Sequence, residues 1–178
     1  MRNLIFGFVI VSIVSCSFHE KRKNDAMKAL KKADTSITSN HPDTLAIEQA
    51  RKAVQSFIQR FPDDTLSPAY LFELALLYEK QRQYDSTIKT LDRIYSFYPH
   101  SKQASKAVFL EGFLYANVLN QLDKAKETYQ FYLDHYANLD SKMTNDVKME
   151  LQNLGKSPEE ILKEIQEKAA KDSTEVPL

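Results

Sequence analysis

The sequence contains only three glycines, one cysteine and no tryptophan in 178 residues, and its 24 basic side chains are balanced by 24 acidic ones. A phosphate-binding loop needs several glycines close together, because backbone amides must approach the ligand. Gly7, Gly112 and Gly155 are far apart, which argues against P-loop and dinucleotide chemistry. The basic residues are interleaved with acidic ones, a pattern typical of a solvated helical surface, so we expect no nucleic-acid partner.

Patterns for metal binding and catalysis are also sparse. The four histidines, which lack ligand-like spacing, are His19, His41, His100 and His135. Since only one thiol is present, we expect no metal site and no cofactor. Glu73 and Glu111 lie 38 residues apart, and stacked helices could pair them as an acid and a base or as a site for a cationic peptide. The simpler interpretation is that both face solvent, and we predict that the protein is not an enzyme.

The first 15 residues have the composition of a signal peptide. Arg2 gives a positive flank, and Leu4 to Val14 form an apolar run of 11 residues. A membrane-spanning helix needs about 20 residues, so this run is too short to cross a bilayer but suits a signal-peptide core. The alternative is a helix of the folded domain. Polar residues follow from Ser15 and no amphipathic face is present, so we favour a signal peptide over residues 1–15.

The segment Ile13-Val14-Ser15-Cys16 resembles the lipobox of bacterial lipoproteins, in which a branched apolar residue and a small residue precede the acylated cysteine. The resemblance implies cleavage before Cys16 and attachment of acyl chains such as palmitate, which anchor a protein firmly when there are two or more. Ser17 follows in place of aspartate, which implies the outer membrane and the periplasmic side. Residues 16–42 are then expected to form a charged tether, with room for a short helix around residues 26–33.

The mature sequence has an internal repeat. An aromatic residue closes a helical stretch at Phe61-Pro62, Tyr98-Pro99 and Tyr136-Ala137, with spacings of 37 and 38 residues. Each preceding segment carries mostly apolar residues at i, i+4, i+7 and i+8, one face of an α-helix. Between them, residues 68–81 and 106–122 are apolar on most sides, so each must be packed between neighbours. Alternation of the two helix types at a fixed period predicts an all-α helical solenoid.

Gly112 with Tyr115, Ala125 with Tyr129, and the aromatic-proline closures resemble tetratricopeptide repeats (TPRs). The slightly long period is similar to that of BamD/CpoB-style periplasmic repeat lipoproteins associated with the outer membrane. Over residues 45–154 this resemblance implies a TPR-like solenoid of about two and a half helix pairs. By the same resemblance, the first helix of each pair lines a peptide-binding groove. The groove candidates are Leu71, Tyr78, Glu79, Phe109, Phe113 and Asn117.

The C-terminal part is predicted to close the domain. A helix over residues 145–154 should stop at Gly155, and Ser157 with Glu160 can form a capping box that starts another helix. The apolar face of this last helix consists of Ile161, Leu162, Ile165 and Ala169. We expect it to cap the open end of the stack, because a terminal repeat must cover its apolar face. The helical domain is thus predicted over residues 43–170, followed by a disordered tail over residues 171–178.

Together these patterns predict a membrane-anchored TPR lipoprotein that acts as a scaffold or adaptor for protein–protein interactions in the bacterial cell envelope. Its expected partners are envelope proteins or peptide segments, and its lipid anchor would hold it on the membrane. The alternative is a small-ligand or glycan-binding lipoprotein that resembles the helical part of SusD-like nutrient binders. Those proteins are several times longer and have binding loops that this chain lacks.

Overall fold

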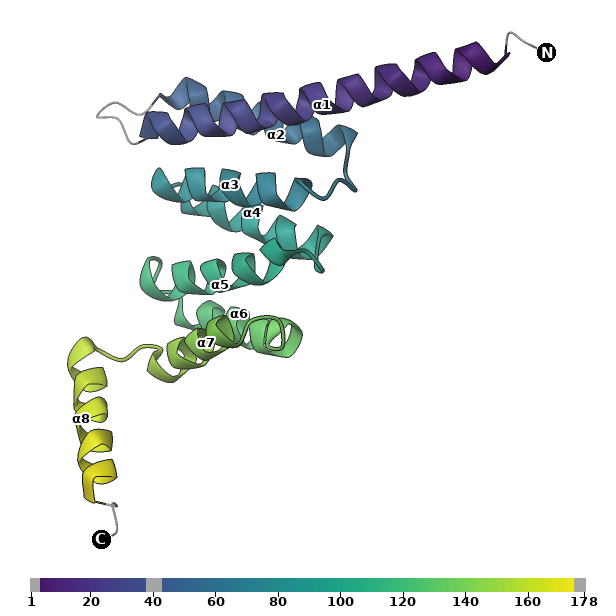
Figure 1. Ribbon diagram of the computed structural model, residues 1–178. Helices are drawn as coiled ribbons and strands as arrows, with labels where there is room; N and C mark the ends of the chain where they lie inside the picture. Colours follow the sequence, from purple (N-terminus) through teal and green to yellow (C-terminus); the bar gives the residue numbers. More distant parts are fainter. Residues whose placement is uncertain (1–3, 38–42, 175–178) are drawn as a thin grey trace. The chain divides into compact units, whose positions relative to one another are not determined.

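The computed structural model describes the backbone of residues 4–37 and 43–174, and the side chains of residues 18–37, 43–167 and 170 (Figure 1). Eight α-helices and no strands are found in these residues, which confirms the predicted all-α class. The helices are α1 (Leu4–Ile37), α2 (Thr44–Arg60), α3 (Ser67–Lys80), α4 (Tyr84–Phe97), α5 (Lys102–Asn117), α6 (Leu122–Tyr136), α7 (Ser141–Asn153) and α8 (Pro158–Thr174).

The chain forms two compact units, Met1–Ala107 and Val108–Leu178. In the first unit, α1 packs against α2, and α3 packs against α4 and also contacts both α1 and α2. Figure 1 shows that the two helices of each pair run in opposite directions, which is the arrangement of helical repeats. The predicted helix over residues 68–81 corresponds to α3, where Pro68 lies in the first turn.

The N-terminal segment differs from the predicted tether. It is helical through Ile37 and is packed, since Ala26, Leu30 and Ala33 are all buried. These residues follow the i, i+4, i+7 spacing of one helix face. The predicted short helix around residues 26–33 therefore exists as part of a much longer helix. No helix among the described residues has the length and apolar content needed to cross a bilayer, and the side chains of residues 1–15 lie outside the description.

The second unit is organised around tyrosines of α6. Tyr129 and Tyr132 are fully buried, and α6 packs against α7. Gly112 of α5 lies directly over the Tyr129 ring, because a Cβ atom built on this glycine would be 2.6 Å from the ring atom Cε1. The predicted helix over residues 106–122 corresponds to α5, which begins and ends earlier. It ends before Asn120, whose φ of 51° is left-handed and cannot continue a helix.

The last two helices confirm the predicted caps but not the predicted packing. Gly155 has a φ of 78° after α7, and the backbone amide of Glu160 donates to Ser157 Oγ while that of Ser157 donates to Glu160 Oε2. However, Leu162 and Ile165 are 56% and 58% exposed. These two residues therefore do not cover a neighbouring helix, and this part of the capping prediction is wrong. An amphipathic face shows which side is apolar, but it does not show that a neighbour lies within reach.

Candidate functional site

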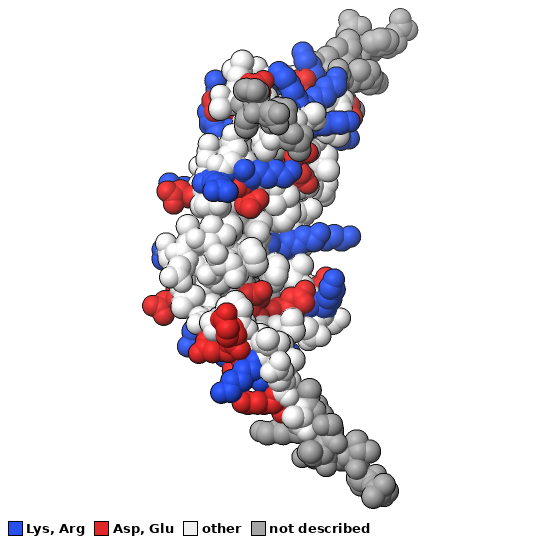
Figure 2. Space-filling model, turned by 90° about the vertical axis from the view of Figure 1, so that its left-hand side faces the viewer, with Lys and Arg blue, Asp and Glu red and all other residues white. Residues whose placement is uncertain are grey.

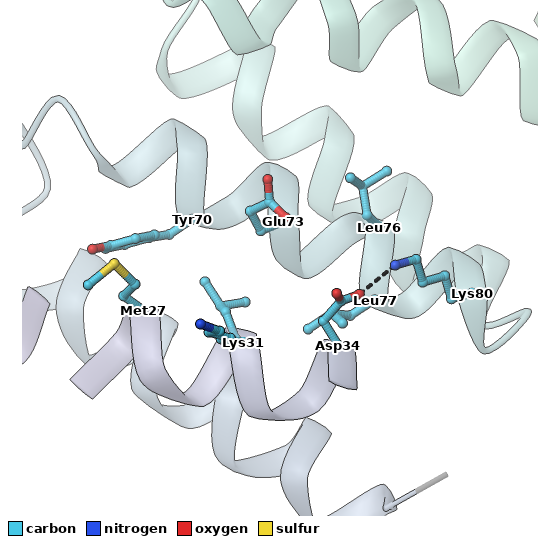
Figure 3. Close-up of a pocket in the computed structure, with 9 residues that line it drawn as sticks. Met27, Lys31, Asp34, Tyr70, Glu73, Leu76, Leu77 and Lys80 are labelled. Carbon is cyan, nitrogen blue, oxygen red and sulfur yellow. Dashed lines mark hydrogen bonds and ion pairs between the residues drawn. The ribbon is translucent and has the colours of Figure 1, made fainter. Parts of the chain in front are cut away.

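A cavity of about 300 Å³ lies between α1 and α3 in the first unit (Figure 3). α1 and α3 are the first helices of successive antiparallel pairs, so the cavity separates two equivalent positions of the repeat. Its lining residues are Met27, Leu30, Lys31 and Asp34 of α1 and Tyr70, Glu73, Leu76, Leu77 and Lys80 of α3. Their spacing of three or four residues places them on one face of each helix.

The floor of the cavity is apolar. Leu30, Tyr70 and Leu77 are buried, and Leu76 is half-buried. The Tyr70 ring is fixed at both ends, because its hydroxyl donates to the backbone oxygen of Lys23 over 3.1 Å and its ring packs edge-on against Phe57. Burial raises the pKa of Tyr70, with smaller contributions from nearby carboxylates. The ring therefore stays neutral and offers an apolar surface to a ligand.

The rim of the cavity is charged. Lys80 of α3 forms an ion pair with Asp34 of α1 across one end, as Figure 3 shows. Lys31 and Glu73 are exposed on opposite helices, and among the described residues neither side chain has an ion-pair partner. The rim thus offers one free positive and one free negative charge beside an apolar floor. Such a site can hold an apolar side chain of a peptide and contact charged groups on either side of it.

A second cavity of about 260 Å³ lies at the other face of α3, between α2, α3 and the start of α4. Here Arg51 binds Glu48 through two nitrogens, with Nε donating to Oε2 over 2.7 Å. These hydrogen bonds lower the pKa of Glu48 from 4.5 to about 2. Tyr78 lines the same cavity, and burial raises its pKa although Arg51 opposes this. The walls of this second cavity therefore carry the Arg51–Glu48 ion pair and the neutral phenol of Tyr78.

The predicted groove residues are divided between the two units, with three on α3 and three on α5. Leu71 is buried in the core and lines neither of the two cavities beside α3. Tyr78 lines the second cavity, and Glu79 is half-buried beside it on α3. The other three belong to α5. They are Phe109, Phe113 and Asn117.

On α5, Phe113 and Asn117 are exposed one helical turn apart, and Asn117 donates through Nδ2 to the backbone oxygen of Phe113. Asn117 also lines a cavity of about 400 Å³ within the second unit, with Leu122 and Ile161 among its walls. Phe109 is half-buried, and its ring centroid is 6.4 Å from that of Tyr129. Phe109 is therefore mainly a packing residue, whereas Phe113 and Asn117 remain accessible.

Sequence reasoning missed the half of the main cavity that α1 provides, namely Met27, Leu30, Lys31 and Asp34. The available signal was the buried spacing of Ala26, Leu30 and Ala33. Two of these three residues are alanines, which give only a weak apolar pattern. The charged residues between them favoured a solvated tether instead.

The remaining candidates for chemistry belong to several different helices. Glu73 is exposed as expected, but Glu111 is buried in α5, so the expectation that both face solvent is wrong for Glu111. His19 Nε2 lies 2.6 Å from Asp64 Oδ2, and His135 stacks on Phe131. His41 lies outside the described residues. Figure 2 shows basic and acidic side chains interspersed on one face of the molecule.

Comparison with known proteins supports the repeat assignment. A tetratricopeptide repeat family model matches residues 69–101, which span nearly all of α3, the whole of α4 and the turn that follows. A comparison with curated proteins finds no match. The matched pair includes the α3 wall of the main cavity, and α1 with α2 forms the antiparallel pair before it. Residues 69–101 therefore match one tetratricopeptide repeat, and the described residues have an all-α, TPR-like helical fold.

Proposed function

We propose that this protein is a membrane-anchored TPR lipoprotein that acts as a protein–protein interaction scaffold in the bacterial cell envelope. The cavity between α1 and α3 carries the proposal, because it combines a buried apolar floor with unpaired charges at its rim. Tetratricopeptide repeats generally bind other proteins, and the matched repeat supplies one wall of this cavity. The expected guest is a polypeptide segment from an envelope protein.

The energetics favour a guest that makes several contacts. Burial of one leucine-sized or phenylalanine-sized side chain contributes about 1.5–3 kcal/mol, which alone is too little for stable association. Lys31 and Glu73 can add contacts to an acidic and a basic group of the guest. We therefore expect a peptide with one apolar residue that enters the cavity and charged residues of both signs beside it.

The N-terminal sequence supports the proposed anchoring. Arg2 and the apolar run from Leu4 to Val14 suit a signal peptide, and Cys16 lies at the lipobox position. Ser17 favours the outer membrane with the domain facing the periplasm. The proposed protein resembles the BamD/CpoB-style repeat lipoproteins. Mass spectrometry of the protein extracted from membranes tests this, since an intact residue 1 and an unmodified thiol would contradict it.

Photo-crosslinking in intact cells tests whether the cavity between α1 and α3 is a groove that binds a polypeptide segment. A photoreactive amino acid in place of Met27, at the edge of the cavity, should crosslink to an envelope protein. The same probe in place of Gln59, an exposed residue of α2 outside the cavity lining, should not. The charge reversal Lys31→Glu should lower the Met27 yield, because it removes the free positive charge.

Equal yields from the two positions, or no crosslink from Met27, would contradict the proposed groove. The alternative function makes a different prediction. A small-ligand or glycan-binding protein should show a higher melting temperature with one sugar or peptidoglycan fragment, because a ligand that binds only the native state stabilises it.

A further inference from the structure

One end of the first unit presents exposed aromatic rings beside the proposed lipidation site. Phe18 follows Cys16 by two positions on α1, and 39% of its surface is exposed. α4 ends at Phe97, which is 73% exposed. Figure 1 shows that the N-terminal part of α1, the turn after α2 and the end of α4 all lie at this same end of the first unit.

The helix is fixed to the rest of the unit from its first described side chains onward. The ring centroids of Phe18 and Phe61 are 6.4 Å apart, and His19 is paired with Asp64 in the turn after α2. Arg22 donates to Ser56 Oγ over 3.2 Å, and its guanidinium lies over the Phe18 ring. Because α1 is docked here, little flexible chain separates Cys16 from the domain. Two helical residues span only about 3 Å.

We infer that this end of the first unit rests on the lipid bilayer, with Phe18 and Phe97 in the membrane interface. The inference depends on the proposed acylation of Cys16. An acyl chain attached so close to a docked helix can enter the bilayer only if the neighbouring surface also approaches the headgroups. Phenylalanine is among the residues that bury their apolar side chains at the boundary between headgroups and acyl chains when a protein lies on a membrane.

The charges at this end favour insertion of the rings over recognition of anionic lipids. Basic Lys21, Arg22, Lys23 and Arg60 lie near acidic Glu20, Asp63 and Asp64 in the sequence, and Lys23 is paired with Glu20, so no purely basic cluster forms. Polybasic clusters are what recognise anionic lipids. The surface is therefore expected to bind zwitterionic bilayers, and its orientation should not depend on lipid charge.

The proposed orientation also determines how far the cavity lies from the membrane surface. Met27 and Asp34, which bound it along α1, follow Cys16 by 11 and 18 residues, or about 16 and 27 Å of helix. If the helices stand upright on the bilayer, the groove opens within roughly 30 Å of the membrane surface. Its guest would then be a segment that lies close to the same membrane.

The absence of tryptophan from the sequence allows a direct test with single-tryptophan reporters. Phe97→Trp reports on the proposed membrane end. Leu45→Trp is the control, because Leu45 is 61% exposed at the start of α2, about 24 Å of helix away from Phe61. Each protein is purified from membranes and reconstituted into phosphatidylcholine vesicles with or without brominated acyl chains.

We expect the tryptophan emission of the Phe97→Trp protein to shift to shorter wavelength on reconstitution and to be quenched in brominated vesicles. The emission of the Leu45→Trp protein should be unchanged. A flexible Gly-Ser linker inserted between Ser17 and Phe18 should reduce the quenching, because it frees the domain from the surface. Equal emission losses, or none, in protein that floats with the vesicles would overturn the inference and leave the proposed anchoring intact.

Failure of the anchoring would be seen separately, as an unmodified Cys16 by mass spectrometry. The Cys16 thiol would then be coupled to a maleimide lipid before the same fluorescence measurement. A blue shift and emission loss confined to Phe97→Trp would still support the membrane-facing end, and equal behaviour of the two reporters would still overturn it.

Discussion

Replacing Phe57 with alanine is expected to destabilise the first unit by about 3–5 kcal/mol, the usual cost of removing a buried phenylalanine. Phe57 is fully buried, and its ring lies 5.1 Å from that of Tyr70 on α3 and 5.8 Å from that of His19 on α1, measured between centroids. A single side chain of α2 thus holds the first helices of both pairs. Its loss should free α1 before the other helices.

The measurement is urea unfolding followed by helical circular dichroism. Phe97→Ala is the matched control, since the same ring is 73% exposed on α4 and its removal should change the free energy of unfolding by less than about 0.5 kcal/mol. Similar free-energy changes for the two variants would show that Phe57 does not occupy the junction of three helices.

Replacing Gly112 with valine is expected to lower the free energy of unfolding of the second unit by about 1–3 kcal/mol, the typical cost of overpacking a core. A Cβ atom at Gly112 would lie 2.6 Å and 2.7 Å from two atoms of the Tyr129 ring. That ring is fully buried, so it cannot move aside cheaply. Thermal or urea unfolding measures the loss.

The control experiment removes the Tyr129 ring. In a Tyr129→Leu background, which is itself less stable, Gly112→Val should cost clearly less than in the native background. The difference between the two costs is the coupling energy between these positions. If Gly112→Val costs the same with and without the Tyr129 ring, the contact between α5 and α6 is not the reason for the glycine.

The second helix pair could be predicted closely because its signals are local. Pro68 lies at the start of α3, an aromatic-proline pair ends α4, and the apolar residues between them follow the helical period. Proline at the start of a helix and just after its end marks both boundaries without any knowledge of neighbours. The match to a tetratricopeptide repeat falls on this same pair.

The first pair could be predicted only in part. α1 is held by small residues, Ala26 and Ala33, that bury little apolar area each and let the helices approach closely. Its charged residues look solvated in the sequence, but His19 and Arg22 make specific contacts with the rest of the unit. Such pairing between residues 34 and 45 positions apart leaves no periodic signal.

The candidate site, like the first helix pair, could be predicted only in part from the sequence. Tyr78 and Leu71 are both groove candidates by resemblance, but Tyr78 lines a cavity, whereas Leu71, from the same helix, is buried in the core. A helix that is apolar on most sides does not reveal which of its faces remains open. The cavity between α1 and α3 needed the position of α1, which the sequence pattern did not supply.

Hydrogen–deuterium exchange of the backbone amides of residues 26–33 tests most directly whether α1 belongs to the repeat domain. If α1 is docked as described, these amides should be protected as strongly as those of α2 around Val54, and Phe57→Ala should remove protection from α1 first. Fast exchange at residues 26–33 with α2 and α3 still protected would show a free tether. In that case neither the groove between α1 and α3 nor the rigid membrane end could exist.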